Sequence, residues 1–201
     1  MQNHDLGGES MKSIGTESIE TKRLVLRRFK YSDCNDALRN WDGDEKIQNS
    51  YGEPVYSTES DVMFLLKKYI FLYSDNNYFR WAIIEKESGE CIGQIAFFLV
   101  DCKNNFAEIE YCIGSKYQNV GYATEATKAI IEYGFKKIEF HKIQICHRSN
   151  NLPSKRVIQK CEFIFEGALR DYFFIDGKYY DRLYYSILID EFIRRSKNAD
   201  T

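Results

Sequence analysis

The stretch that decides the fold is residues 117–126, which read Tyr117-Gln118-Asn119-Val120-Gly121-Tyr122-Ala123-Thr124-Glu125-Ala126. It lies between a run with strand character and a run with helical spacing. Gly121 lets the main chain approach a ligand closely, and small Ala123 keeps the next turn open. The first amides of a helix have no partners within the helix, and the helix dipole is positive there. The stretch predicts a phosphate-binding helix start, although a glycine before a helix is more often a plain turn.

Working outward from this stretch, predicted strands and helices follow one another along the whole chain. The ranges with strand character are 23–29, 78–85, 91–100, 106–113, 142–147, 163–175 and 178–189. The ranges with helical character are 32–41, 58–73, 121–137 and 153–161. Short turns join the three strands between 78 and 113, which indicates an antiparallel meander, and Asp176-Gly177 indicates a hairpin.

The helix at 121–137 connects two strands that should run parallel, because a crossover of that length joins parallel neighbours. We therefore predict an α/β fold with a mixed α+β sheet. About seven mostly antiparallel strands would be split around a central β-α-β crossover and flanked by about four helices. A ligand cleft is expected at the split.

The composition favours one soluble globular domain. The chain has 201 residues, of which 44% are hydrophobic and 29% charged, with a formal net charge of −2. No stretch approaches the about 18 apolar residues of a membrane span. The polar, Gly/Ser-rich start lacks the apolar core of a secretory signal. We predict a flexible tail at 1–18, a single domain at 19–195 and a second tail at 196–201.

Several classes of function fit poorly. The charge is too balanced, and the Lys/Arg pairs too sparse, for nucleic-acid binding. Neither a GxGxxG sequence opening a helix nor a P-loop sequence occurs. His141 and His147 have no partners at metal spacing, and the six cysteines form no CxxC pair, so we expect no metal. Scattered, reduced thiols indicate a cytoplasmic protein, and no membrane partner is expected.

Four segments together resemble one known family. Gln118-x-x-Gly121-x-Ala123 resembles the pyrophosphate loop of the GNAT acetyltransferases. Arg23-Leu-Val-Leu-Arg27 resembles their first strand, and Glu108-Ile-Glu-Tyr111 resembles the E-I-G-Y of the fourth. The segment 151–163 resembles the N-x-x-S-x-R-V-L-E-K-x-G-F pattern of the Rim-type branch, whose members are ribosomal-protein-alanine acetyltransferase-like. The match covers nearly the whole expected domain and implies the GNAT fold.

The resemblance implies that acetyl-CoA is the co-substrate and that no metal takes part. Its pantetheine arm would pair with the strand at 111–113, and its pyrophosphate would lie on the amides of 118–124. The residues expected to contact it are Tyr111, Cys112, Ile113, Gln118, Asn119, Val120, Gly121, Tyr122, Ala123, Thr124 and Asn151. Asn151 is alternatively a plain helix cap.

Three residues are candidates for proton transfer. Glu108 and Glu110 are two apart on a strand and should share one face, with Tyr111 on the other. One glutamate would be the base and the other an anchor for a cationic amine, with Glu108 preferred as the base; ordinary surface charges are the alternative. The tyrosine that many family members use as an acid is replaced by Ile158. Ser154 could donate to the leaving thiolate, or cap its helix instead.

The resemblance implies an acetyl-CoA-dependent N-acetyltransferase in which a primary amine attacks the thioester directly. The acceptor would be a protein N-terminus or a small cationic amine. Glu110 stands where the family has glycine, which keeps open a catalytically idle acyl-CoA-binding regulatory module. Thiol release from acetyl-CoA with a panel of amines separates the two. A homodimer is reasonable because the terminal strands are expected to be exposed.

Overall fold

The computed structural model describes residues 11–199 of the chain and shows one mixed sheet. Within these residues, eight strands follow the order β1-β2-β3-β4-β5-β6-β8-β7. All neighbours are antiparallel except β5 and β6. The strands are β1 Ile19–Glu20, β2 Leu24–Arg27, β3 Phe79–Glu85, β4 Cys91–Asp101, β5 Phe106–Ile113, β6 Lys142–Arg148, β7 Ile164–Ile175 and β8 Lys178–Leu188.

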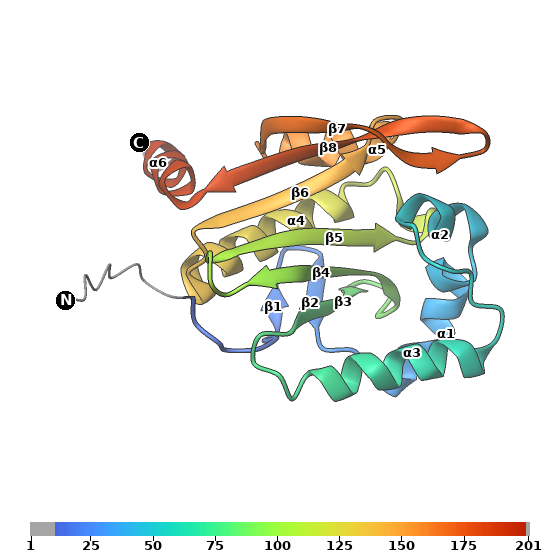
Figure 1. The fold of residues 1–201 in the computed structure, drawn as a ribbon. Helices are drawn as coiled ribbons and strands as arrows, with labels where there is room; N and C mark the ends of the chain where they lie inside the picture. The colour runs from blue at the N-terminus through green and yellow to red at the C-terminus, as the bar shows by residue number, and fades with distance from the viewer. Residues whose placement is uncertain (1–10, 200–201) are drawn as a thin grey trace, which may run out of the picture.

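Helices cover both faces of this sheet (Figure 1). The α-helices are α1 Cys34–Ala37, α2 Glu45–Tyr51, α3 Glu59–Leu72, α4 Tyr122–Tyr133, α5 Leu152–Lys160 and α6 Ile189–Ala199. Side chains from α4 and α5 join one buried cluster, and side chains from α1, α2 and α3 join a second. A π-helical turn, Leu38–Asp42, follows α1 directly. The predicted α/β fold with a mixed, mostly antiparallel sheet is confirmed.

Local sequence explains several of the element boundaries. The Thr58 side chain accepts a hydrogen bond from the Asp61 N–H, and Asp61 bonds back to Thr58, so a capping box starts α3. The predicted apolar stripe of α3 is buried at Val62 and Leu66. The turn between β7 and β8 has positive φ at both Asp176 (50°) and Gly177 (74°). Two positive φ values match the twist of a two-residue hairpin, as the sequence predicted.

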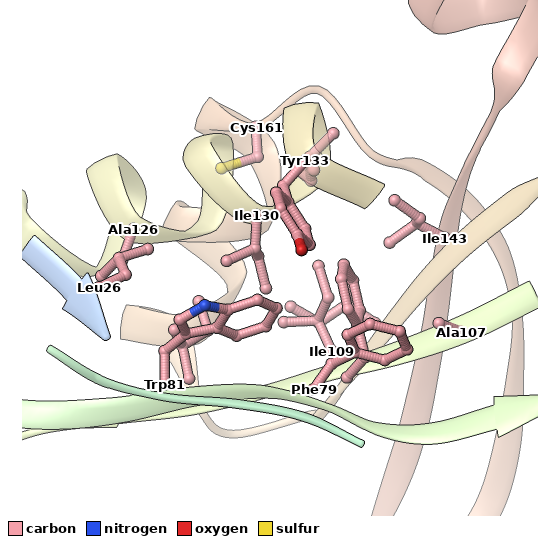
Figure 2. Close-up of a cluster of buried hydrophobic side chains, with 14 of the residues drawn as sticks. Leu26, Phe79, Trp81, Ala107, Ile109, Ala126, Ile130, Tyr133, Ile143 and Cys161 are labelled. Carbon is pink, nitrogen blue, oxygen red and sulfur yellow. The ribbon is translucent and has the colours of Figure 1, made fainter. Parts of the chain in front are cut away.

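The larger core lies between the sheet and α4. Figure 2 shows Ile130 and Tyr133 of α4 pointing at Phe79 and Trp81 of β3. Trp81 is fully buried, and its ring meets that of Tyr133 edge-on at 5.6 Å between centroids. Ile109 on β5 also belongs to this cluster. This packing fixes α4 against β5 and so fixes the position of the helix start.

The structure corrects the expected tail boundaries. Met11 is buried, and the Lys12 N–H donates to the Ile138 carbonyl (2.7 Å), so residues 11–18 pack on the domain. At the other end, α6 extends through residues 196–199, and Phe192 stacks on Phe135 with centroids 4.9 Å apart. Both segments are mostly polar, so the sequence predicted tails. Only a few apolar side chains, such as Met11 and Phe192, hold them on the domain. The remaining parts of the predicted tails, 1–10 and 200–201, lie outside the described residues.

Three elements, β1, α2 and α6, were not predicted from the sequence. Neither β1, of two residues, nor α2, of seven, is long enough to show a repeating pattern. The missed α6 is amphipathic but follows a strand without a turn. Of these, α2 matters most for function because it lies beside the carboxyl end of β5.

Candidate active site

The sheet opens between its two parallel strands. β5 pairs with β6 from Phe106 only as far as Ile109, although β5 itself continues to Ile113. On its other side β5 remains paired with β4 up to Ile113. Figure 1 shows β5 and β6 separating beyond the paired segment. The predicted split is therefore present, and it lies at residues 110–113 of β5.

The main-chain N–H and C=O groups of successive β5 residues point alternately toward β4 and toward the split. The Gly114 N–H donates to the Ile92 carbonyl beside β4 (2.8 Å). Because successive residues of a strand turn their main-chain groups to opposite sides, Tyr111 and Ile113 turn theirs away from β4. The Ile113 carbonyl accepts a hydrogen bond from Nε2 of Gln118 (2.9 Å). The other polar groups of these two residues are placed to pair with an extended ligand.

The predicted phosphate loop runs directly from this strand end to the start of α4. Gly121 is the residue before the helix, with φ of 93°, and no side chain caps the helix start. The first main-chain bond of the helix runs from the Glu125 N–H to the Gly121 carbonyl (3.0 Å). Among the described residues, the N–H groups of 122–124 donate no main-chain bond. Three amides at the positive end of a helix dipole fit a diphosphate.

Arg23, at the start of the first predicted strand, holds this loop. Nε of Arg23 donates to Glu125 (2.7 Å), and its Nη1 donates to the Val120 carbonyl (2.9 Å). Burial opposes ionisation of Glu125, but hydrogen bonds from Thr21 and Arg23 hold its pKa below the ordinary value. Arg23 also lies over the Tyr122 ring, 4.5 Å from the centroid. Arg23 lies about 100 residues before Val120 and Glu125 in the sequence, so no local pattern could predict these contacts.

Both glutamates of β5 lie on one face, as predicted, but each is paired with an arginine. Glu108 is 2% exposed and accepts hydrogen bonds on both oxygens, from Nη2 of Arg182 (2.8 Å) and Nε2 of Gln144 (2.7 Å). Glu110 lies at the beginning of the split and forms an ion pair with Arg80. Nη1 of Arg80 also donates to Gln94 (2.6 Å). The two carboxylates are therefore not simple solvated charges.

On the opposite face of β5, Tyr111 meets α5. The Tyr111 hydroxyl and Oγ of Ser154 are 3.1 Å apart, and either can donate. Asn151 caps α5, since its side chain accepts a hydrogen bond from the Ser154 N–H (3.1 Å). The capping alternative thus applies to Asn151 and is wrong for Ser154. Ile158, the position at which the resemblance implies a tyrosine, is fully buried.

The remaining predicted contacts differ in exposure. Cys112 and Ile113 are buried in the sheet, and burial raises the pKa of the Cys112 thiol. The loop residues Gln118, Asn119 and Val120 are exposed. Half-buried positions are Tyr111, Gly121, Tyr122, Ala123, Thr124 and Asn151. The loop is therefore open to a ligand along its whole length.

A hollow of about 890 Å³ lies between α2 and the tip of the β7–β8 hairpin. We call it the acidic hollow, because its lining carries four carboxylates and two cations. The lining residues are Asp44, Glu45, Lys46, Gln48, Asn49, Ser50, Gly52, Glu53, Arg148, Ile175 and Asp176. Eight of these eleven residues come from α2 and the positions next to it, residues 44–53.

Metal ligands, membrane spans and disulfides can be considered within residues 11–199. No group of three or more His, Cys, Asp or Glu side chains there is arranged to hold a metal ion. No helix in that range is long and apolar enough to cross a membrane. The six cysteines are free, and four of them are buried.

A split parallel strand pair beside an uncapped helix start defines a class of protein, the acyl-CoA-dependent acyltransferases. Comparison with known proteins gives the particular family: the pattern described as "Acetyltransferase (GNAT) domain" matches residues 23–164. The chain belongs to the GNAT acetyltransferase family. It is an acetyl-CoA-dependent N-acetyltransferase.

Three similar proteins illustrate this membership. "Uncharacterized N-acetyltransferase YnaD" of Bacillus subtilis (strain 168) is 31% identical over 86% of this chain and 98% of its own length. "Spermidine N(1)-acetyltransferase" of Vibrio cholerae serotype O1 is 25% identical over 87% of this chain and 98% of its own. A crystal structure of an acetyltransferase (GNAT family) from Bacillus anthracis is 27% identical, with a TM-score of 0.75, and covers 87% of this chain and 100% of that one.

Proposed function

We propose that this enzyme acetylates a primary amine carried by a small cationic molecule. The observation that carries the proposal is the acidic hollow, which has an excess of two negative charges in its lining. Its wall at α2 contacts β5, and Oγ of Ser115, two residues after β5, donates to Asp44 of the lining (2.6 Å). A concave site with this charge attracts an ammonium group and concentrates it near the thioester. A relative named as a spermidine N(1)-acetyltransferase is consistent with this class of acceptor.

For the co-substrate, we propose that acetyl-CoA lies along the split of the sheet. The main chain of Tyr111 and Ile113 would pair with the pantetheine arm as an added strand does. The amides of residues 122–124 would bind the pyrophosphate. Acetyl-CoA supplies the activated acyl group, so the protein needs to orient it, polarise its carbonyl and move protons.

The roles of the three proton-transfer candidates follow from their partners. Glu110 has the better position for acceptor binding, because it lies where β5 leaves β6 and its side chain is 23% exposed. Both oxygens of Glu108 are bonded, so we assign Glu108 to holding Arg182 of β8 against β5. The Ser154–Tyr111 hydroxyl pair is suited to protonate the departing thiolate, which would then need no tyrosine at Ile158.

An acceptor screen tests the proposal directly. Thiol release from acetyl-CoA is followed with spermidine, n-butylamine, a neutral aromatic amine and peptides with free alanine or serine N-termini. We expect the highest kcat/KM with the polycation and a steep fall as salt screens the hollow. Preference for the peptides at all salt concentrations would overturn the choice of acceptor.

Two finer properties are also proposed. Residence in the cytoplasm is supported by the free cysteines, because oxidising compartments favour disulfides. A homodimer through β7 is supported by the position of this strand at the sheet edge and by its exposed Phe165, Leu169 and Phe174. Sedimentation of the purified protein at several concentrations checks the dimer, and a single monomeric species would exclude it.

A further inference from the structure

Several buried polar atoms near the acidic hollow lack a hydrogen-bond partner within standard geometry. They come from the π-helical turn, α2, the loop before β3 and β3 itself, and they surround the carboxyl end of β5. These atoms are Trp41 Nε1, Asp42 Oδ2, Gln48 Oε1, the Tyr51 and Tyr78 hydroxyls, and Arg80 Nε. Buried polar groups are nearly always bonded in folded proteins. The Trp41 indole still acts on Asp42 as a hydrogen-bond donor, and Arg80 acts in the same way on Tyr78. Oε1 of Gln48 and the Tyr51 hydroxyl are therefore the atoms left to bond with water or with a bound ligand.

Asp42 is the unusual member of this set. It is 2% exposed, and its Oδ1 accepts one hydrogen bond, from Nε2 of Gln48 (3.0 Å). In the described part of the chain it forms no ion pair with a lysine or arginine, in contrast to Glu108 and Glu110. Burial raises the pKa of Asp42 to about 7, despite the opposing effects of Gln48 and the Trp41 indole. A carboxylate that exchanges a proton near neutral pH is suited to general-base catalysis.

The location of Asp42 joins the two substrate sites. Gln48 lines the acidic hollow and bonds to Asp42, so one side chain separates this carboxylate from the hollow. On another side, the π-helical turn that carries Asp42 contacts β5. The pKa of the Cys112 thiol on β5 is raised first by burial and then by the charge of Asp42. Asp42 therefore lies between the proposed acceptor site and the strand end at the split.

The groups that face Asp42 come from every element around it. The side chains of these groups interact electrostatically with Asp42 or form hydrogen bonds with it. They are Cys34 on α1, Trp41 beside it, Gln48 on α2, Glu53 and Tyr56 after α2, Tyr69 on α3, Arg80 on β3 and Cys112 on β5. Of these, Glu53 opposes ionisation of Asp42 and Arg80 favours it.

We propose that Asp42 is the proton acceptor that converts the bound ammonium of the acceptor into the attacking amine, an inference that rests on the proposed function. One proton passes from R–NH3+ to the Asp42 carboxylate through water bonded to Oε1 of Gln48, which lines the hollow, and R–NH2 remains. The amine lone pair forms the C–N bond to the thioester carbonyl carbon, and the C–S bond breaks. The second amine proton reaches the thiolate sulfur through the Ser154–Tyr111 pair. Asp42 then returns its proton to water.

The first experiment measures kcat and KM against pH for the wild type and Asp42→Asn, with the best acceptor of the screen. Asn keeps the shape of the side chain and can still accept from Gln48. We expect kcat to fall about 100-fold or more, as for loss of a general base. The ascending limb near neutral pH should disappear, and the KM for acetyl-CoA should stay unchanged. Asp190→Asn, the same change on the exposed start of α6, is the control and should match the wild type.

The second experiment needs no turnover. Side-chain carboxyl carbons of 13C-aspartate-labelled protein are titrated by NMR, and the Asp42 signal is identified by its absence in Asp42→Asn. We expect it to titrate near pH 7 and to shift when n-butylamine is added at pH 8. Titration near pH 4 or no response to the amine would overturn the role of Asp42, as would Asp42→Asn with wild-type kcat and pH profile. If no amine is acetylated, the proposed acceptor class fails, and the NMR titration still decides Asp42.

Discussion

At the scale of single residues, the acidic side chains near the split differ through their partners. Glu108 and Glu110 each lie beside an arginine, whereas Asp42 is buried without one. Burial disfavours the charged form of a carboxylate, and an adjacent cation favours it. These carboxylates therefore lie in different electrostatic surroundings, two on β5 and one in the π-helical turn.

The charge of Asp42 should make stability depend on pH. Its pKa is raised from 3.8 to about 7, so the folded protein binds this proton more tightly than the unfolded chain does. Below about pH 4, Asp42 is protonated in both the folded and the unfolded state and does not reduce the free energy of unfolding. As the pH rises from about 4 toward 7, its contribution lowers the free energy of unfolding by about 4 kcal/mol in total. Urea denaturation at several pH values should show Asp42→Asn gaining stability over the wild type across that range. A constant difference between the two would contradict the shift.

Gly121 is the second residue that single-site substitution can probe. Its φ of 93° is left-handed, and an added Cβ would lie 3.4 Å from Nη2 of Arg23. Gly121→Ala should lose about 1–2 kcal/mol of stability through backbone strain. It should also weaken CoA binding, measured by calorimetry, because the loop shifts.

Gly89→Ala provides the matched control. Gly89 has a φ of 72° and no atom near its missing Cβ, so the variant carries similar strain away from the loop. Equal loss of CoA affinity in both variants would mean that the loop around Gly121 has no special part in binding.

At the scale of elements, one ion pair fastens three strands. Arg182 of β8 and Gln144 of β6 both bond to Glu108 of β5, below the point where β5 and β6 separate. This ion pair lies in the part of the sheet where β5 and β6 are still paired, and the two strands separate beyond it, at residues 110–113 of β5. Element order alone, β5-β6-β8, brings these side chains together.

Removing one partner should therefore be costly. Arg182→Met leaves the Glu108 carboxylate buried without a cation and should lower the free energy of unfolding by about 3–5 kcal/mol. Glu108→Gln combined with Arg182→Met should recover most of this loss. Chemical denaturation measures both, and Arg170→Met on exposed β7 is the control. A double variant as unstable as the single one would show that packing, rather than charge, causes the loss.

At the scale of the whole molecule, the acidic hollow is assembled from distant parts of the chain. α2 supplies one wall, and the turn of the β7–β8 hairpin supplies Asp176 on the other. These parts are more than 100 residues apart in sequence and meet because β8 pairs with β6. Acceptor binding is therefore a property of the complete domain.

Charge removal at the hairpin tests this assembly. Asp176→Asn should raise the KM of a cationic acceptor several-fold at low salt and leave the KM of acetyl-CoA unchanged. Asn tolerates the positive φ of 50° at this turn. Asp171→Asn changes the same charge at a similar φ of 52° on β7, outside the lining of the hollow. If Asp176→Asn and Asp171→Asn raise the KM of the acceptor equally, the acceptor responds to the overall charge of the protein rather than to the lining of the hollow.

The sequence by itself determined the order of the main elements, the split at the crossover and the helix start at Gly121. These depend on local patterns: strand alternation, the helical stripe of α3, the Asp176-Gly177 turn and a glycine before a helix. The same patterns placed Glu108 and Glu110 on one face.

Only the tertiary structure decided which charges are paired. Glu108 meets Arg182 from 74 positions away, and Glu110 meets Arg80 from 30, so no window of sequence contains either pair. Asp42 comes directly after the predicted helix at 32–41, where the sequence gives no sign of burial. It is 2% exposed because α2 and α3 pack against the π-helical turn that carries it. The chemistry of a side chain depends on burial and on neighbours from other strands, and both follow from packing rather than from spacing along the chain.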